Sequence, residues 1–193
     1  MFNGLALMML IMWPLIQLFL IQVHVAPNFW RRLSVWTYLV IFMEDLPLVY
    51  AINLWQDAII QYQIRTNPPI FALGAALVTA GIVLHAWTAK LLGIRTTIGY
   101  TELKPKNETQ NLITSGPFSV VRHPSYVAHT FIFGGIFLIT GVLAVGLMAL
   151  TDFLISYFIT MELEERELIQ RFGNQYRKYQ MSIPKFFPKI RSQ

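Results

Sequence analysis

The chain has 193 residues, of which 55% are hydrophobic and only 13% are charged, whereas roughly 25% are charged in an ordinary soluble domain. It contains no cysteine, which excludes disulfides, thiolate nucleophiles, iron–sulfur clusters and cysteine zinc sites. The formal net charge is +5, and the basic residues stand beside apolar runs, where anionic lipid headgroups would lie. We therefore interpret the charge as a mark of membrane topology, expect no nucleic-acid partner, and predict an all-α integral membrane protein.

The first three apolar runs predict three membrane-spanning helices. Residues 1–30 contain no Lys, Arg, Asp or Glu, so they lack the basic start of a cleavable signal peptide, and we interpret 4–22 as a retained first span. Runs of about 20 apolar residues are long enough to cross a hydrocarbon core about 30 Å thick. By the same criterion, spans two and three are expected at 35–55 and 69–93.

A longer apolar stretch, 123–161, is expected to form two spans. As one helix it would be about 57 Å long at about 1.5 Å per residue, which is too long for a single crossing. A reversal near Thr140 and Gly141 would divide it into two antiparallel spans. We therefore predict five transmembrane helices in a single multi-pass membrane domain, 1–193.

The distribution of Lys and Arg predicts the orientation of these spans. Of the 15 basic residues, all but Arg65 fall in segments on one side. Because cytoplasmic loops collect Lys and Arg, we expect the amino terminus outside and the carboxyl terminus in the cytoplasm, with the cell membrane as the location. The polar segments 94–122 and 162–193 then share the cytoplasmic face, which makes about 94–193 the expected catalytic region.

The sharpest local pattern is a helix start at 115–126, with the sequence Ser-Gly-Pro-Phe-Ser-Val-Val-Arg-His-Pro-Ser-Tyr. Pro124 suits the first position of a helix, and His123 before it is biased toward an extended conformation. Free backbone N–H groups of the first turn would form an anion site beside Arg122 and His123. The alternative is that Arg122 is only a topological anchor and His123-Pro124 only a cap.

A cluster of acids follows the fifth predicted span, where carboxylates could accept hydrogen bonds from a ligand's diol. The alternative is an ordinary solvated helix surface, paired with Arg166 and Arg171. The cluster consists of Glu162, Glu164, Glu165 and Glu167.

Ionisable residues also occur inside the predicted spans, where they are costly and suggest function. Glu44 and Asp45 stand in span two beside Pro47, which could break the helix so that both acids line a wet cavity. His85 in span three and Asp152 in span five are similar cases. A direct role for Glu44 and Asp45 with substrate and a structural role as partners for other polar groups both remain open.

The order and spacing of several short motifs resemble those of the isoprenylcysteine carboxyl methyltransferase family and the related phospholipid methyltransferases. The resemblance extends from roughly Lys104 to Pro188. It is carried by Gly116-Pro117-Phe118, Arg122-His123-Pro124-Ser125-Tyr126, Glu164-Glu165, Leu168, Phe172-Gly173, Tyr176, Tyr179, Ile183-Pro184 and Pro188.

The resemblance implies a cytosolic pocket for S-adenosylmethionine, built by the last spans, the connector and the carboxyl-terminal tail. The adenine would meet 110–113 and Phe118, and Glu164 would accept from the ribose hydroxyls or hold the cofactor's amine. His123, Tyr126 and Glu164 would position the cofactor, with no residue assigned to acid or base catalysis. The full set implied for the cofactor is Lys104, Gln110, Asn111, Leu112, Ile113, Phe118, His123, Pro124, Ser125, Tyr126, Glu164 and Glu165.

The implied reaction is an in-line transfer of the sulfonium methyl group to a lipophilic acceptor in the membrane, leaving S-adenosylhomocysteine. Such a displacement needs proximity, alignment and exclusion of water. A carboxylate acceptor of the prenylcysteine type would arrive already ionised. No metal is expected, because none of the histidines has a partner at a recognisable metal-ligand spacing.

Two departures from the family pattern bear on the acceptor. The prenylcysteine enzymes have a substrate-linked arginine four residues before the motif glutamate, where this chain has Thr160. The Gly-Trp that often follows the motif tyrosine is Ala128-His129. Glu44, Asp45 and Thr160 are therefore candidate substrate residues, and a phospholipid amine or another lipophilic acceptor stays open.

Two rival functions are considered. Membrane sterol reductases carry a similar Arg-His-Pro-x-Tyr helix start and use it for NADPH, but no additional basic cluster for a 2′-phosphate is evident in this chain. A small transporter could use Glu44, Asp45 and Asp152 as a polar relay. It would leave the motifs of the catalytic region unexplained.

Overall fold

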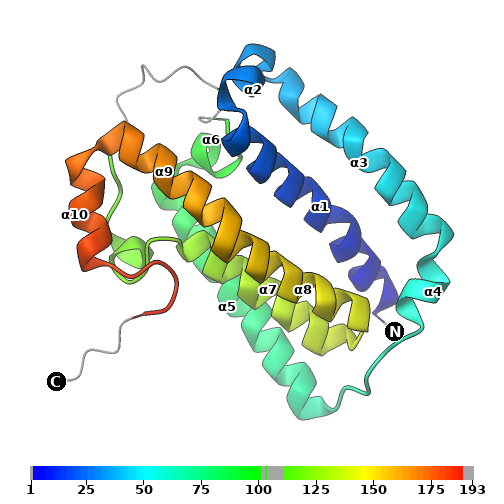
Figure 1. The fold of residues 1–193 in the computed structure, drawn as a ribbon. Helices are drawn as coiled ribbons and strands as arrows, with labels where there is room; N and C mark the ends of the chain where they lie inside the picture. Colours follow the sequence, from blue (N-terminus) through cyan, green and yellow to red (C-terminus); the bar gives the residue numbers. More distant parts are fainter. Residues whose placement is uncertain (1, 101–102, 104–110, 189–193) are drawn as a thin grey trace.

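The structure is a computed structural model that describes residues 2–100, 103 and 111–188. These residues form helices and connecting segments, with one isolated β-bridge between Gln63 and Val142, so the predicted all-helical class is confirmed (Figure 1). The elements in chain order are α1 (Asn3–Val25), α2 (Pro27–Leu33), α3 (Trp36–Leu54), α4 (Gln56–Ile60), α5 (Pro68–Leu92), α6 (Ile94–Thr97), the 3-10 turn η1 (Gly116–Ser119), α7 (Pro124–Thr140), α8 (Leu143–Ile155), the π-helical turn η2 (Ser156–Thr160), α9 (Met161–Phe172) and α10 (Asn174–Ser182).

Four helical stretches of the described chain are long and apolar enough to cross a membrane. They are α1, α3, α5 and the continuous helix that runs from α8 through η2 to α9. The fourth predicted span corresponds to α7, an apolar helix of 17 residues. At about 1.5 Å per residue α7 is about 25 Å long, somewhat less than the hydrocarbon core. The count of five spans stays a prediction.

Helices α5 and α7 pack against each other so closely that they leave no room for side chains at two points. A Cβ atom added to Gly74 would lie 2.7 Å from the backbone oxygen of Gly135, and one added to Gly135 would lie 2.6 Å from that of Gly74. Small residues at a helix interface permit this approach in membrane proteins. The pair α5–α7 therefore forms one closely packed part of the bundle.

The predicted reversal between spans four and five lies at Gly141, which has the left-handed φ of 68° that favours glycine. Its carbonyl accepts a hydrogen bond from the Ile64 N–H at 2.9 Å, and the Leu143 N–H donates to the Tyr62 carbonyl at 2.9 Å. The α7–α8 turn and the segment before α5 thus meet at one end of the bundle, as the five-span prediction requires.

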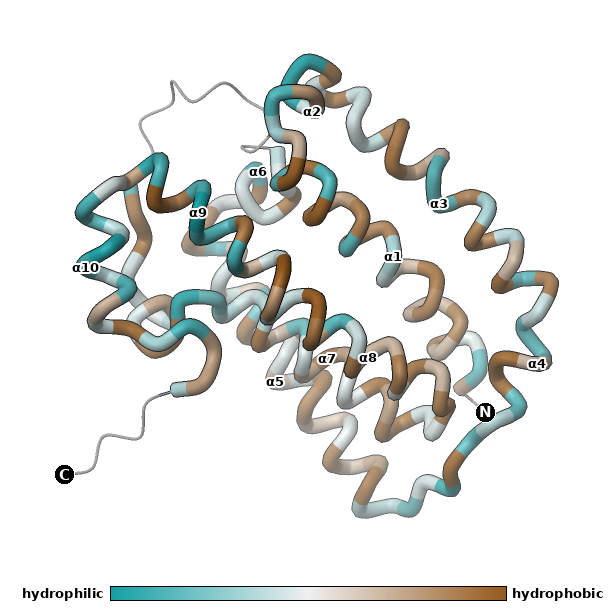
Figure 2. The backbone as a smooth tube through the Cα atoms, in the orientation of Figure 1, coloured by the Kyte–Doolittle hydropathy of each residue, from teal (hydrophilic) through white to brown (hydrophobic). Residues whose placement is uncertain are grey.

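The opposite end of the bundle is polar. Figure 2 shows hydrophilic residues concentrated in α9 and α10, whereas α1, α5 and α8 are mainly hydrophobic. An ion pair between Arg31 of α2 and Glu167 of α9, 2.7 Å long, joins two segments at this end. The basic segments predicted to share one face of the membrane therefore do meet at one end.

Polar residues within the spans form contacts between helices. Asp152 of α8 accepts hydrogen bonds from Trp13 and Gln17 of α1, the first at 2.7 Å. On α3, Glu44 accepts from Gln22 at 2.6 Å. These contacts support the structural alternative for Asp152 and Glu44. Asp45 is buried, and no described residue donates a hydrogen bond to its carboxylate.

Candidate functional site

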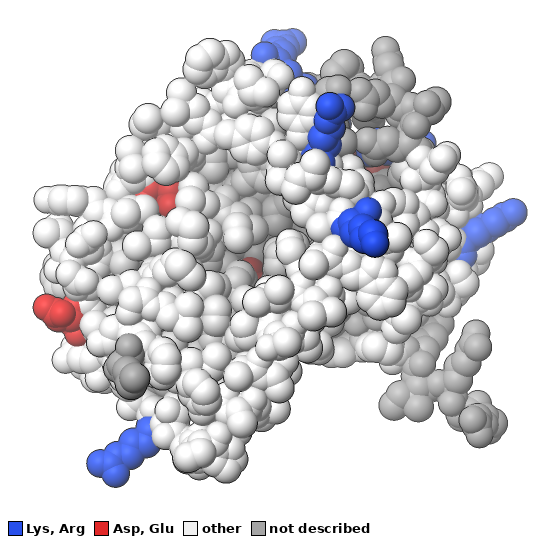
Figure 3. Space-filling view, turned by 180° about the vertical axis from the view of Figure 1, so that it is seen from behind, with Lys and Arg blue, Asp and Glu red and all other residues white. Residues whose placement is uncertain are grey.

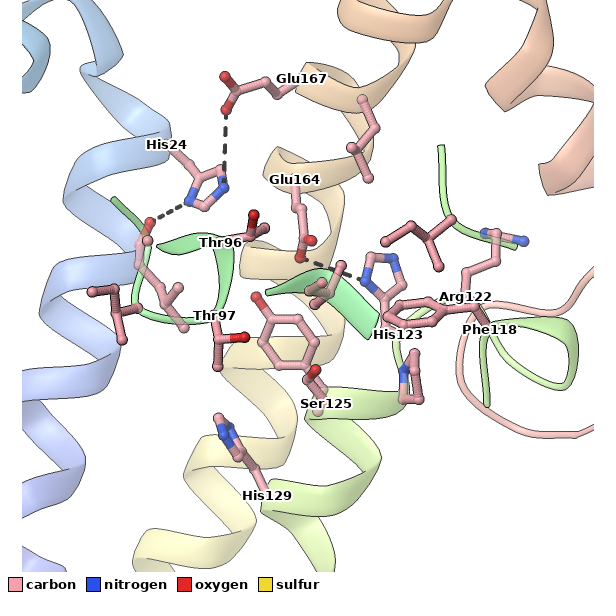
Figure 4. A pocket seen from close by; sticks show the side chains of 18 of the residues that line it. His24, Thr96, Thr97, Phe118, Arg122, His123, Ser125, His129, Glu164 and Glu167 are labelled. Atoms are coloured by element: carbon pink, nitrogen blue, oxygen red, sulfur yellow. Dashed lines mark hydrogen bonds and ion pairs between the residues drawn. The ribbon is translucent and has the colours of Figure 1, made fainter. Parts of the chain in front are cut away.

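A cavity of about 740 Å³ lies at the polar end of the bundle. Its walls come from α1, α3, α5, α6, α7, α9 and α10, together with the segment 111–113 and the η1 turn. Pockets for small ligands in proteins usually measure about 300–1,000 Å³, so the volume of this cavity is in the range of small-molecule sites. Figure 4 shows residues from several helices converging on it.

A histidine held between two carboxylates forms the centre of the polar wall. His123 Nε2 lies 3.0 Å from Glu165 Oε1, and His123 Nδ1 lies 3.5 Å from Glu164 Oε2. The Glu164 side chain is 32% exposed and lines the cavity, whereas that of Glu165 is only 8% exposed and lies behind it. Of the two acids, Glu164 is therefore the one that can meet a ligand.

The two carboxylates also set the charge of His123. Burial by itself lowers the pKa of this imidazole, but hydrogen bonds and charge from Glu164 and Glu165 outweigh burial and hold the pKa above its ordinary value of 6.5. The ring is therefore favoured as an imidazolium, which donates from both nitrogens. It orients Glu164 from behind and partly balances its charge.

Behind this wall, Arg122 connects the helix start to the end of the chain. Its guanidinium donates to Glu165 at 2.8 Å and to the backbone carbonyls of Gln180 and Ile183. Gln180 in turn donates to the other oxygen of Glu165 at 2.8 Å. The Glu165 carboxylate is thus fully engaged in holding Arg122, His123 and the tail together, a cluster called the Glu165 clamp below.

The backbone of the tail lies against the start of α7. The N–H groups of Arg122 and His123 donate to the carbonyls of Pro184 and Lys185 at 2.9 and 3.2 Å. The N–H groups of Tyr126 and Val127 donate to the His123 carbonyl at 3.2 and 3.4 Å. At this helix start the N–H groups of Tyr126 and Val127 therefore already have an acceptor in the chain, and the anion site stays a prediction.

A tyrosine secures the η1 turn beside the cavity. The Tyr179 hydroxyl donates to the Phe118 carbonyl at 2.6 Å. Burial raises the pKa of Tyr179 to about 12, so the hydroxyl stays protonated at physiological pH and remains a donor. Phe118 is held in the cavity wall by this contact.

A second charged group borders the cavity between α1 and α9. His24 Nε2 lies 4.0 Å from Glu167 Oε2, and His24 Nδ1 lies 2.6 Å from the Leu20 carbonyl. Glu167 also pairs with Arg31. Figure 4 shows Glu167 and His24 at one end of the cavity and His129 at the other.

The remaining wall of the cavity is largely apolar. It includes Leu15, Ile16, Phe19 and Leu20 of α1 and Ile41 of α3. Polar groups in this part come from α5, α6 and α7. The cavity thus has a charged end near α9 and an apolar end among the spans, so one ligand could be polar and its neighbour lipophilic.

Most of the residues assigned to the cofactor from the resemblance line this single cavity. They are Asn111, Leu112, Ile113, Phe118, His123, Pro124, Ser125, Tyr126 and Glu164. Glu165 is in the clamp behind the wall, and Lys104 and Gln110 lie outside the described residues. Their roles with the cofactor stay predictions.

The candidate substrate residues Glu44, Asp45 and Thr160 do not line the cavity. Thr160 is fully buried in η2, and among the described residues its hydroxyl has no hydrogen-bond partner. Among residues 2–100, 103 and 111–188, no contact supports a substrate role for these three residues, which stays a prediction.

Several lining residues were not predicted from the sequence. They include His24 and Arg171, together with Thr96, Thr97 and Gly99 of α6 and the turn after it, whereas the lining residue Glu167 belongs to the predicted acid cluster. His24 lies at the polar end of the first span, and a histidine there is only a weak sequence signal for a residue that lines a cavity. Nothing in the sequence pairs it with Glu167, because the two residues are far apart in the chain.

Comparison with known proteins places the chain in a family. The phospholipid methyltransferase family matches residues 69–175, more than half of the chain, so the protein belongs to that family. It is also 28% identical over 160 residues to the cobalt-zinc-cadmium resistance protein CzcN of Cupriavidus metallidurans. That match covers 83% of this chain and 65% of the relative, so the chain spans less than two thirds of that protein's length. No solved structure matches the chain.

The family membership bears out the resemblance found from the sequence motifs. The chain is accordingly a member of the phospholipid methyltransferase family, with several helices long and apolar enough to cross a membrane. The matched region, 69–175, contains the helix start at His123-Pro124 and the acids of α9, and it ends near the beginning of α10.

Proposed function

We propose that the protein transfers the methyl group of S-adenosylmethionine to a lipophilic acceptor that reaches the cavity from the membrane. The observation that carries this proposal is the cavity itself, which joins a charged end at Glu164 and His123 to an apolar end at α1. A polar cofactor and an apolar acceptor can then meet in one enclosed space. Family members generally use this cofactor, which supports the choice.

The residues at the charged end fit the cofactor's chemistry. The cofactor supplies an electrophilic methyl group on a sulfonium, a positively charged centre. Glu164, oriented by the His123 imidazolium, can accept hydrogen bonds from ribose hydroxyls or from the amine of the methionine part. The backbone of Asn111, Leu112 and Ile113 borders the position proposed for adenine. The volume of about 740 Å³ leaves room for an acceptor beside the cofactor.

The protein's contribution to the reaction is positioning and exclusion of water. The apolar wall from α1 and α3 would keep water from the reacting atoms, and the rigid α5–α7 pair would hold the two reactants in line. Figure 3 shows a hollow near the centre of one face, surrounded mostly by uncharged residues. We propose that face as the route by which a lipophilic acceptor enters.

The proposal extends to topology. Five spans, with α7 as the fourth, would put the amino terminus outside and the charged end of the cavity at the cytoplasmic face, where the cofactor is available. The terminal Arg and Lys residues of α2, α5 and α9 lie at that end, in agreement with the positive-inside rule. The experiment below also tests the two alternative functions, an NADPH-dependent reductase and a transporter.

Calorimetric titration of S-adenosylhomocysteine into the detergent-purified protein tests this function. We expect micromolar binding that is lost in Glu164→Ala, and we expect no binding of NADPH. Glu162→Ala is the matched control, because Glu162 is an exposed acid of the same helix and does not line the cavity. Binding of NADPH in place of S-adenosylhomocysteine would favour the reductase. Binding of neither ligand would favour the transporter.

A further inference from the structure

Two histidines from neighbouring helices form a pair deep in the cavity wall. His85 of α5 and His129 of α7 both line the cavity, and their ring centroids are 5.1 Å apart. The Nδ1 atoms of both rings are buried, and neither has a hydrogen-bond partner among the described residues. Buried polar atoms in folded proteins nearly always have a partner, so this pair points to a ligand or substrate group that supplies one.

The packing of the two helices holds the pair in place. Ser125 of α7 and Thr88 of α5 share a hydrogen bond of 3.2 Å between their hydroxyls. Because α5 and α7 are joined there, His129, one turn after Ser125, and His85, one turn before Thr88, come to lie side by side. His129 also stacks on Phe133 with a centroid distance of 5.8 Å.

The pair lies toward the end of the cavity opposite His24 and Glu167. The Tyr126 ring lies beside both His123 and His129. Its centroid is 5.7 Å from that of the His123 ring and 6.2 Å from that of the His129 ring. In Figure 4, His129 lies beyond Ser125 on α7, away from Glu164 and Glu167. A lipophilic acceptor next to the cofactor would therefore present its reacting group close to these imidazoles.

The charges around the pair favour one class of acceptor. A carboxylate removed from water needs a cation or several donors to offset the loss of hydration. Among the described lining residues, Arg122 is bound to Glu165, the His123 ring is paired with Glu164 and Glu165, and Arg171 belongs to α9. None of these three forms an ion pair or hydrogen bond with the histidine pair in the described part of the chain. A neutral imidazole, in contrast, can accept a proton from a protic group.

We propose that His85 and His129 form the acceptor subsite and that the acceptor is a lipophilic molecule with a protic nucleophile, a hydroxyl, thiol or amine. This inference rests on the proposed methyl transfer and departs from the carboxylate expected from the sequence. The lone pair of the nucleophile attacks the sulfonium methyl carbon, and the carbon–sulfur bond breaks with its electron pair going to sulfur. The proton of the nucleophile passes to an imidazole nitrogen, so the products are the methylated acceptor, S-adenosylhomocysteine and an imidazolium that releases its proton.

Methyl transfer to a series of molecules with one common alkyl chain tests the acceptor class. The chain ends in a hydroxyl, a thiol, an amine or a carboxylate, and transfer of labelled methyl is followed in single turnovers. We expect transfer to at least one protic chain and little to the carboxylate. In His85→Gln and His129→Gln, general-base catalysis predicts a loss of about 10²- to 10⁴-fold in that rate. Thr130→Val is the control, because Thr130 neighbours His129 and its hydroxyl donates to the Tyr126 carbonyl of its own helix.

A binding measurement without the cofactor provides a second readout. His129→Phe preserves the aromatic stacking on Phe133 but removes the polar atoms. It should weaken binding of the protic chain by about two- to tenfold, the contribution of one neutral hydrogen bond. Affinity for S-adenosylhomocysteine should be unchanged in every variant, which separates this subsite from the cofactor site.

Three results would overturn the inference. They are preferred methylation of the carboxylate chain, unchanged rates in both Gln variants, and S-adenosylhomocysteine binding without transfer to any protic chain. If the wild-type protein fails to bind S-adenosylhomocysteine, the proposed function falls, and this inference falls with it.

Discussion

Replacing Glu165 with alanine should destabilise the protein more than any other single change in the acid cluster of α9. Glu165 is 6% exposed and accepts hydrogen bonds from Arg122 and Gln180, at 2.8 Å each, and pairs with His123 at 3.0 Å. In Glu165→Ala the Arg122 guanidinium would stay largely buried, with 10% of its side chain exposed, and would lose its carboxylate. Breaking a buried ion pair in this way costs about 3–5 kcal/mol.

This cost can be measured as a change in thermal stability. For a chain of this size, about 1 kcal/mol corresponds to about 2–4 °C in Tm, so Glu165→Ala should lower the Tm by roughly 6–20 °C. Tryptophan fluorescence of the protein in detergent would follow unfolding. Glu162→Ala is the comparison, because Glu162 is 51% exposed and its ion pair with Lys185 is at the surface. Such pairs contribute about 0–1 kcal/mol, so its Tm should change little.

The Glu165 clamp also predicts which segment loses its contacts in Glu165→Ala. Arg122 donates to the carbonyls of Gln180 and Ile183, so loss of Glu165 should loosen the tail, and limited proteolysis should cut Glu165→Ala first near 180–188. A Glu165→Ala protein that melts and resists protease like the wild type would refute the reasoning. Equal destabilisation by Glu162→Ala would show that general surface charge, not the clamp, sets the stability.

Three further outcomes follow from the structure. The pKa of His123 in the folded protein is raised above 6.5, so the contribution of this residue to stability should be complete below about pH 6.5. That contribution should decline as the pH rises through the raised pKa. Measurements of Tm against pH should show the decline in the wild type and not in His123→Asn. Gly74→Ala should lower stability by about 1–3 kcal/mol in denaturant titrations, because its Cβ would contact the Gly135 carbonyl at 2.7 Å, whereas Gly134→Ala meets open space and should be neutral. Tyr179→Phe should cost about 1–3 kcal/mol by leaving a buried carbonyl without its donor, a loss that thermal unfolding would reveal.

The local features of the fold were predictable because they depend on neighbouring residues. The apolar runs indicated the helices that became α1, α3 and α5 within a few residues of their observed ends. The reversal at Gly141 followed from the length of the stretch 123–161. Motif spacing also identified the family before any comparison.

The site was predictable only in part. The motif residues from Asn111 to Glu164 line one cavity, but Glu165 was assigned to the same surface as Glu164 although it points into the clamp. Consecutive helical residues lie about 100° apart around the axis, so adjacent acids cannot share one face. The helices packed around α9 decide whether Glu164 or Glu165 faces a ligand.

By itself the sequence determined that the chain is a helical membrane protein, the approximate bounds of α1, α3 and α5, and the phospholipid methyltransferase family to which the chain belongs. Each of these depends on hydrophobic periodicity, glycine and proline positions, or short motifs, which act over a few neighbouring residues. Only the tertiary structure decided that His24 meets Glu167 and that His85 meets His129. Such contacts join residues far apart in the chain, and they form only because closely packed helices such as α5 and α7 bring their side chains together.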